Sequence, residues 1–152
     1  MKILRLIFFL AVPIVAGSIG ALAPSGQGYS ELVRPAFSPP GWVFGPVWSI
    51  LYILIGISGY LAWQAGRKQD RRAAFTVYFF QLFLNSIWTL IFFGLGQRFW
   101  ALIEIIILLI FITANIVLFY KLSKTAAYLL VPYLLWVAFA SVLTFSVWRL
   151  NI

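Results

Sequence analysis

The chain has 152 residues, of which 64% are hydrophobic and 9% are charged, far from the ~25% charged residues of an ordinary soluble domain. This composition, with its long uninterrupted apolar stretches, excludes a soluble enzyme and predicts an all-α membrane protein. In such a protein a formal net charge of +8 reflects the Lys and Arg residues that set its orientation in the membrane. No nucleic-acid partner is therefore expected.

Five apolar runs predict a five-transmembrane-helix bundle, because each run approaches the ~20 residues that a helix needs to cross a bilayer. We place these helices at residues 4–23, 43–65, 74–94, 100–120 and 126–148. The first run resembles a secretory signal, since Lys2 and Arg5 precede it and small residues lie near its end. Its apolar stretch exceeds the ~7–15-residue core of a signal, so we expect it to remain as the first span.

Lys and Arg are distributed unequally between the two sides that five spans define. The amino-terminal side has Lys2, Arg5, Arg67, Lys68, Arg71, Arg72, Lys121 and Lys124, and the other side has Arg34, Arg98 and Arg149. The positive-inside rule therefore predicts a cytoplasmic N-terminus and a C-terminus outside. An odd number of spans does not divide into the two equal inverted halves that are common in secondary transporters.

The first connection, residues 24–42, is longer than the ~2–8 residues that join adjacent helices. Pro35, Pro39 and Pro40 restrict its backbone to extended geometry, and Tyr29 and Phe37 supply apolar anchors. We therefore expect this long first loop to act as a lid over the bundle. The alternative is a stiff connector.

One face of the second span mixes aromatic and small residues. Trp48, Tyr52, Gly56, Gly59 and Trp63 follow one another at steps of three or four residues, which places them on one side of a helix. The indole N–H of a Trp inside a span needs a partner within the protein or a cavity. This face is a candidate wall of a ligand pocket. The alternative is that its rings and gaps only fill the bundle core.

The third and fifth spans carry polar and aromatic residues at similar spacing. These residues are Gln81, Asn85 and Trp88 in the third span and Tyr133, Trp136, Ala140 and Thr144 in the fifth. An amide inside hydrocarbon must hydrogen-bond to a neighbouring helix or to a ligand. For Asn85 we favour the link between helices.

Glu104 is the only acid inside a predicted span, one turn after the expected start of the fourth helix. The helix dipole favours a carboxylate there, so we expect it to cap the helix or to reach interfacial water. In the first span, small residues spaced by four, such as Ala16 and Gly20, allow close approach of another helix. That contact is either internal packing or the face of a homodimer.

Three segments resemble the TspO/MBR family of translocator proteins, which are related to the peripheral benzodiazepine receptor. The first, from Arg34 to Gly56, reads R-P-x-F-x-P-P-x-W-V-F-G-P-x-W-x-x-L-Y-x-x-x-G. The second runs from Gln81 to Phe93 and the third from Val131 to Ala140. The resemblance covers nearly the whole chain, so we expect one TspO/MBR-type membrane domain over residues 1–152.

This resemblance implies a bundle, usually homodimeric, whose first loop covers a pocket. The pocket would bind tetrapyrroles such as protoporphyrin IX or haem, and isoquinoline or benzodiazepine-type ligands, with a role in porphyrin handling or stress regulation. The expected ligand-binding residues are Trp42, Trp48, Tyr52, Asn85, Trp88, Tyr133, Trp136 and Ala140. Some bacterial members promote light-dependent porphyrin breakdown with a Trp pair, and the matching positions are Trp48 and Trp136.

The chain departs from the family pattern at three places. Gly28 precedes Tyr29 where relatives often have Trp, which we expect to loosen the lid. Thr144 stands where many relatives have Asn. The segment 142–149 lacks the central Tyr of the cholesterol-recognition pattern, so sterol binding is not predicted.

The residue types suit a flat apolar ligand, because a free-base porphyrin needs aromatic walls, a cleft and few charges. The chain has no Cys, no His and a single Met, Met1, so no metal site is expected and no cofactor is required. Haem would be held by its face, with Tyr as its only direct ligand. The expected partners are a tetrapyrrole or another flat hydrophobic molecule, the lipid bilayer of a bacterial cell membrane and a second copy of the chain.

Two other functions stay open at this stage. In the first, light and oxygen drive porphyrin degradation through Trp48 and Trp136, although no acid, base or nucleophile constellation supports ordinary catalysis. In the second, the protein transports small solutes, against which stand the odd span count and the scarcity of charge inside the membrane.

Overall fold

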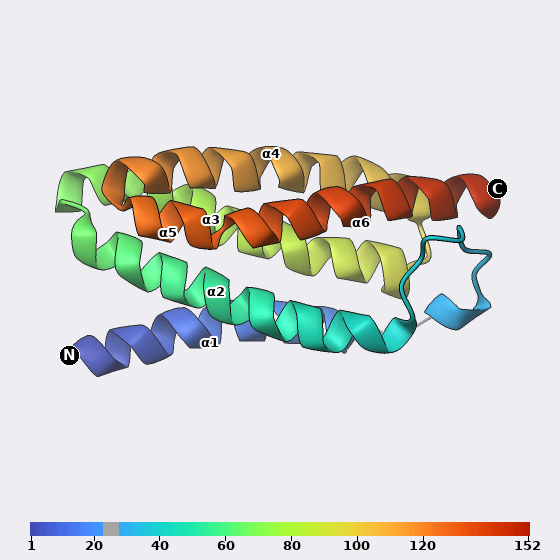
Figure 1. The fold of residues 1–152 in the computed structure, drawn as a ribbon, viewed down its shortest axis with the longest axis horizontal. Coiled ribbons are helices and arrows are strands. Elements are labelled where there is room, and N and C mark those ends of the chain that lie inside the picture. Colours follow the sequence, from blue (N-terminus) through green and yellow to red (C-terminus); the bar gives the residue numbers. More distant parts are fainter. Residues whose placement is uncertain (23–27) are drawn as a thin grey trace.

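The fold was analysed in a computed structural model that describes residues 1–22 and 28–152. Within these residues five helical spans are long and apolar enough to cross a membrane, which confirms the predicted all-α layout (Figure 1). The elements in chain order are α1 (Lys2–Ala21), η1 (Tyr29–Glu31), η2 (Gly41–Val43), α2 (Phe44–Ala65), α3 (Lys68–Thr89), η3 (Leu90–Gly94), α4 (Arg98–Leu122), α5 (Lys124–Leu129) and α6 (Val131–Leu150).

The third helix begins at Lys68, six residues before the predicted position 74. Its first turn is charged, and Arg67 Nε donates to Asp70 Oδ2 at 3.2 Å. Apolar periodicity marks the part of a helix that lies in hydrocarbon, whereas the backbone hydrogen bonds continue into the polar interface. The prediction therefore located the apolar part of α3 and missed its charged first turns.

The fifth span consists of two helices, α5 and α6, which meet at Leu130. Pro132 at the start of α6 lacks the backbone N–H that a continuous helix would need there. Ser58 of α2 secures α5, because its hydroxyl donates to the carbonyl oxygen of Ala126 at 2.7 Å. The break thus lies where a neighbouring helix supports the backbone.

A backbone contact joins α1 to α2. Pro13 is inside α1 and donates no hydrogen bond, so the carbonyl of Phe9 one turn earlier lacks its usual helical partner. This oxygen would lie 2.6 Å from a Cβ atom at Gly56, so only glycine fits there. At Gly59 a Cβ would lie 2.7 Å from the Tyr78 hydroxyl. Packed neighbours therefore fill both gaps of the second-span face, and these two glycines do not line a pocket.

Hydroxyl and amide side chains link α3 to α1 and to α4. Ser86 of α3 donates to the carbonyl oxygen of Ala16 in α1 at 2.7 Å, and Asn115 Nδ2 of α4 donates to the Ala74 carbonyl at 3.4 Å. A Cβ at Gly17 would collide with the Tyr52 ring. The small residues Ala16 and Gly17 therefore serve packing within the bundle.

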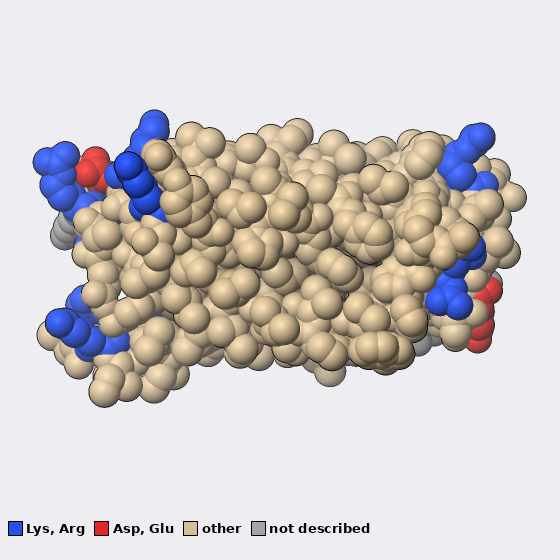
Figure 2. All heavy atoms as spheres, viewed as in Figure 1, with Lys and Arg blue, Asp and Glu red and all other residues tan. Residues whose placement is uncertain are grey.

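Lys and Arg side chains gather at the two ends of the molecule, and the long surface between them carries no charge on the face shown (Figure 2). Such an uncharged belt matches the hydrocarbon core of a bilayer, with the basic groups at headgroup level. Both the belt and the five spans support a multi-pass membrane protein.

Candidate functional site

A chain of buried hydrogen bonds links α2, α3 and α6 in the middle of the bundle. Tyr52 donates its hydroxyl proton to Asn85 Oδ1 at 3.0 Å, and Asn85 Nδ2 donates to the Tyr133 hydroxyl at 3.2 Å. The Tyr133 hydroxyl in turn donates to Gln81 Oε1 at 2.8 Å. Asn85 therefore links helices, as the sequence predicted.

Aromatic rings cover this network on the side of the first loop. Trp48 stacks on Tyr52 with 5.3 Å between ring centroids and meets the edge of Tyr133 at 6.3 Å. Phe44, one turn before Trp48, meets Trp136 of α6 edge-on at 5.9 Å. The five predicted residues that the structure brings together here form what we call the central cluster: Trp48, Tyr52, Asn85, Tyr133 and Trp136.

The first loop extends this aromatic arrangement at the end of the bundle where α6 finishes (Figure 1). Tyr29 meets Phe44 edge-on at 5.1 Å, and the guanidinium of Arg34 lies 4.8 Å from the centre of the Tyr29 ring. The Tyr29 hydroxyl donates to the Pro39 carbonyl oxygen at 3.2 Å. A continuous series of rings thus runs from Tyr29 through Phe44 to Trp136.

Several buried polar atoms in the bundle have no hydrogen-bond partner among the described residues. They include Gln81 Nε2, Trp88 Nε1, Trp136 Nε1, both carboxyl oxygens of Glu104 and Asn115 Oδ1. An unsatisfied buried polar group costs about 1–3 kcal/mol, and such groups often mark functional positions. The described part of the interior therefore offers N–H donors of Gln81, Trp88 and Trp136, and acceptor oxygens of Glu104 and Asn115, to a ligand.

The expectation for Glu104 was wrong. The helix begins at Arg98, earlier than predicted, so residue 104 lies well beyond its first turn. Glu104 shares the inner face of α4 with the buried residues Ala101, Ile105 and Leu108, and only 7% of it is exposed. It therefore neither caps the helix nor reaches interfacial water through its carboxyl oxygens.

The other predicted site residues lie around the central cluster or apart from it. Ala140 is buried one turn after Trp136. Trp88 is buried and stacks on Phe92 at 5.1 Å, within α3 and the π-helical segment η3. Trp42 is 75% exposed, which suits a residue at the membrane interface.

Sequence reasoning did not include Phe44, Gln81 or Glu104 among the candidate ligand-binding residues. Phe44 could have been found from its four-residue spacing to Trp48, which puts both on one helix face. Gln81 has the same spacing to Asn85 and was noted only as part of a face. For Glu104 the sequence did not indicate that its side of α4 faces the bundle interior, because apolar residues lie on every side of this helix.

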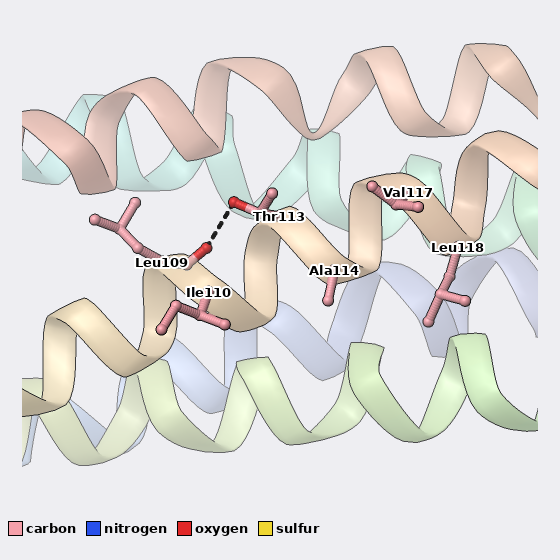
Figure 3. A pocket seen from close by; sticks show the side chains of 6 residues that line it. All are labelled: Leu109, Ile110, Thr113, Ala114, Val117 and Leu118. Atoms are coloured by element: carbon pink, nitrogen blue, oxygen red, sulfur yellow. Dashed lines mark hydrogen bonds between the residues drawn. The ribbon is translucent and has the colours of Figure 1, made fainter.

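A separate hollow of 720 Å³ lies on the outer side of α4, where Ile110, Thr113 and Val117 are exposed (Figure 3). All six of its lining residues belong to this one helix. The one hydroxyl among these lining residues belongs to Thr113 and donates its proton to the Leu109 carbonyl at 2.9 Å. The hollow is therefore a shallow apolar surface, suited to lipid chains.

Comparison with known proteins identifies relatives along almost the full chain. The sequence model described as the TspO/MBR family matches residues 9–149. The tryptophan-rich protein TspO of Archaeoglobus fulgidus is 43% identical over 99% of both chains. The translocator protein of Homo sapiens is 38% identical over 94% of this chain and 88% of its own. The tryptophan-rich sensory protein of Cereibacter sphaeroides is 34% identical over 94% of this chain and 89% of its own.

Proposed function

Because the chain belongs to the TspO/MBR family, we propose that its central cluster binds tetrapyrroles such as protoporphyrin IX. The observation that carries this proposal is the combination of aromatic rings with unused polar groups. Trp48 and Trp136 offer flat apolar faces, and the N–H groups of Trp136 and Gln81 lack acceptors. A free-base tetrapyrrole has a flat apolar ring, acceptor nitrogens and carboxylates that suit these groups.

The side chains of the central cluster differ in burial, and burial decides which of them can move to admit a ligand. Tyr133 is fully buried and Asn85 is 1% exposed, whereas Trp48, Tyr52 and Trp136 are only partly buried. The three partly buried rings are the ones that can turn outward at the smallest cost in packing. We propose that the ligand enters from the loop side, with residues 28–43 as the lid.

Ligand titration tests this proposal. Protoporphyrin IX added to the purified protein in detergent should quench Trp fluorescence and shift the porphyrin absorption band. The double variant Trp48→Phe and Trp136→Phe should weaken binding by about tenfold, the equivalent of one lost aromatic contact of ~1.4 kcal/mol. A matched control removes two other indoles, Trp100→Phe and Trp148→Phe, and should keep the affinity. Unchanged absorption titrations in the first variant would show that the ligand binds elsewhere.

A second candidate function is light-dependent degradation of the bound porphyrin. Its support is that Trp136 packs against Phe44, while Trp48, one turn after Phe44 on α2, packs against Tyr133. An excited porphyrin among these rings would contact an oxidisable indole. In this scheme an indole gives one electron to the excited ring, and molecular oxygen is the final oxidant. Illumination under air, with the porphyrin bands followed in time, separates the two functions. Equal loss in the wild type and in the Trp48 and Trp136 double variant would leave only free photobleaching.

We also propose an orientation and an assembly. The end of the bundle with the N-terminus carries most of the Lys and Arg residues, which favours a cytoplasmic position in a bacterial cell membrane. A second copy of the chain is the proposed protein partner. Accessibility of single Cys residues placed at positions 2 and 152 would test the orientation, since the wild-type chain has no Cys. Labelling of both positions from the same side would contradict it.

A further inference from the structure

The amino-terminal end of the bundle has a groove between α1 and α3. Its base is Trp63, which reaches from the end of α2 and contacts Phe9 at 5.9 Å and Phe75 at 5.1 Å between ring centroids. Two hollows, of 390 and 310 Å³, share Trp63 as a wall. In Figure 1 the first turns of α1 diverge from α2 at this end of the molecule. We call the two hollows together the amino-terminal groove.

Three arginines line this groove. Arg5 of α1 lines the larger hollow, and Arg71 and Arg72 at the start of α3 line the smaller one. Neither hollow has an acid among its described lining residues, and the nearby Asp70 is already paired with Arg67 at 3.2 Å. The described part of the groove therefore carries a concentrated positive charge.

Arg71 packs against Trp63 within the groove. Its guanidinium lies 4.9 Å from the centre of the Trp63 ring, a cation–π geometry. Its Nε atom is buried and lacks a hydrogen-bond partner among the described residues. A basic side chain that only extends into solvent keeps its polar atoms in water, so Arg71 differs from an ordinary interfacial arginine.

The wall below these arginines is apolar and open to the side. Phe8 of α1 and Phe79 of α3 are 52% and 39% exposed and meet edge-on at 6.4 Å between ring centroids. Arg5 and Phe8 are three residues apart, so charge gives way to apolar surface within ~5 Å along α1. A ligand that fits both parts has an anionic head and a long apolar tail.

We propose that the amino-terminal groove binds an anionic glycerophospholipid. Its phosphate group contacts Arg5, Arg71 and Arg72, and one acyl chain lies along Phe8 and Phe79. Basic pockets between transmembrane helices are the usual sites for anionic headgroups. Charge complementarity selects this occupant, because a zwitterionic lipid brings a cation into the same cluster. The groove lies at the opposite end of the bundle from the first loop, so this site is independent of the proposed tetrapyrrole site.

Lipid binding to the purified full-length protein in detergent tests the proposal. Native mass spectrometry would count retained lipids during titration with phosphatidylglycerol and, separately, with phosphatidylcholine of the same acyl chains. We expect one phosphatidylglycerol per chain to bind at least about tenfold more tightly than phosphatidylcholine, from ~1 kcal/mol for each nearby basic residue. Phosphatidylglycerol should also raise the melting temperature. Equal retention of both lipids would overturn the proposal and leave only a general lipid shell.

A charge-matched pair of variants separates the groove from the rest of the basic surface. Arg5→Gln with Arg72→Gln removes two exposed groove charges and leaves Arg71 on Trp63. Lys121→Gln with Lys124→Gln removes two charges from the same end of the bundle outside the groove. The first variant should lose about tenfold in phosphatidylglycerol affinity and the second less than about twofold. Equal losses would overturn the proposal in favour of general surface electrostatics.

The last arm of the experiment distinguishes a lipid from a free phosphate compound. Glycerol 3-phosphate carries the same charged group without acyl chains, so it should not displace the bound lipid at equal concentration. Displacement by this soluble compound would overturn the lipid assignment. Both double variants should keep the melting temperature of the lipid-free protein, which would show that they remain folded. A lower melting temperature for the groove variant alone would count against a binding role.

Discussion

The side chain of Asn151 pairs with both backbone groups of Val33. Asn151 Oδ1 accepts from the Val33 N–H at 3.1 Å, and Asn151 Nδ2 donates to the Val33 carbonyl oxygen at 2.8 Å. The same amide also donates to the carbonyl oxygen of Val147 in α6 at 2.8 Å. The carboxyl end of the chain therefore holds the first loop in place over the bundle.

Removal of this amide should loosen the first loop. In Asn151→Ala the two hydrogen bonds to Val33 are lost, at about 0.5–1.5 kcal/mol each, so residues 28–40 should exchange amide hydrogens roughly tenfold faster or more. Ligand association and dissociation should both accelerate. Ser146→Ala is the control, because that hydroxyl bonds only within its own helix, to Val142. Identical exchange in the loops of wild type and Asn151→Ala would contradict this role.

The amide of Asn85 should contribute to stability through the helices it links. Asn85→Leu removes the bonds to Tyr52 and Tyr133 and leaves the partly buried Tyr52 hydroxyl without this acceptor, which should cost about 1–3 kcal/mol. Chemical unfolding in detergent micelles, followed by circular dichroism, measures this loss. Thr113→Val, on the exposed side of α4, replaces a hydroxyl by a methyl group of similar size. This control should change the free energy of unfolding by less than ~0.5 kcal/mol. If the Asn85→Leu protein were as stable as the Thr113→Val protein, the hydrogen-bond network would contribute nothing to stability.

Glu104 should oppose stability and favour binding. Glu104→Leu removes a buried carboxyl group without a partner and fills the same space, so it should raise the free energy of unfolding by about 1–3 kcal/mol. If this carboxyl group accepts an N–H group of the ligand, the same variant should bind protoporphyrin IX more weakly, and Glu104→Gln should retain part of the affinity. Ile106→Leu on the exposed side of α4 is the control for both measurements. A Glu104→Leu protein that is less stable than wild type would indicate an internal partner for the carboxyl group.

The contact between Gly56 and α1 should tolerate no side chain. Gly56→Ala introduces a Cβ atom 2.6 Å from the Phe9 carbonyl oxygen and 2.9 Å from the Leu10 Cα atom, so α1 must shift. Such overpacking costs about 1–3 kcal/mol. Gly45→Ala is the matched control, since nothing lies within 4 Å of its Cβ position. Equal melting temperatures for the two variants would show that α1 and α2 separate easily.

Features that depend on local sequence could be predicted for this chain, whereas features that depend on contacts between helices could not. Apolar length and periodicity depend only on local sequence, so the five spans were correctly predicted, and spacing placed Trp48 with Tyr52 and Tyr133 with Trp136. The direction in which α4 presents Glu104 depends on its neighbours, and an evenly apolar helix gives no local indication of it. The filling of the gaps at Gly56 and Gly59 likewise depends on α1 and α3, which no pattern within α2 reveals. Whether the grouped residues bind a ligand remains a prediction.

The π-helical end of the third span behaves as a one-residue insertion. In η3 the N–H of Leu95 donates to the Leu90 carbonyl at 2.9 Å, five residues back instead of the four of an α-helix. Each added residue turns a helix by about 100°, so everything after Leu90 is rotated by that angle relative to an uninterrupted α-helix. Deletion of one residue in this segment would restore regular helix geometry and turn the Gly94–Gln97 connection away from the start of α4. A single residue in η3 thus sets the direction in which the chain leaves α3 towards α4.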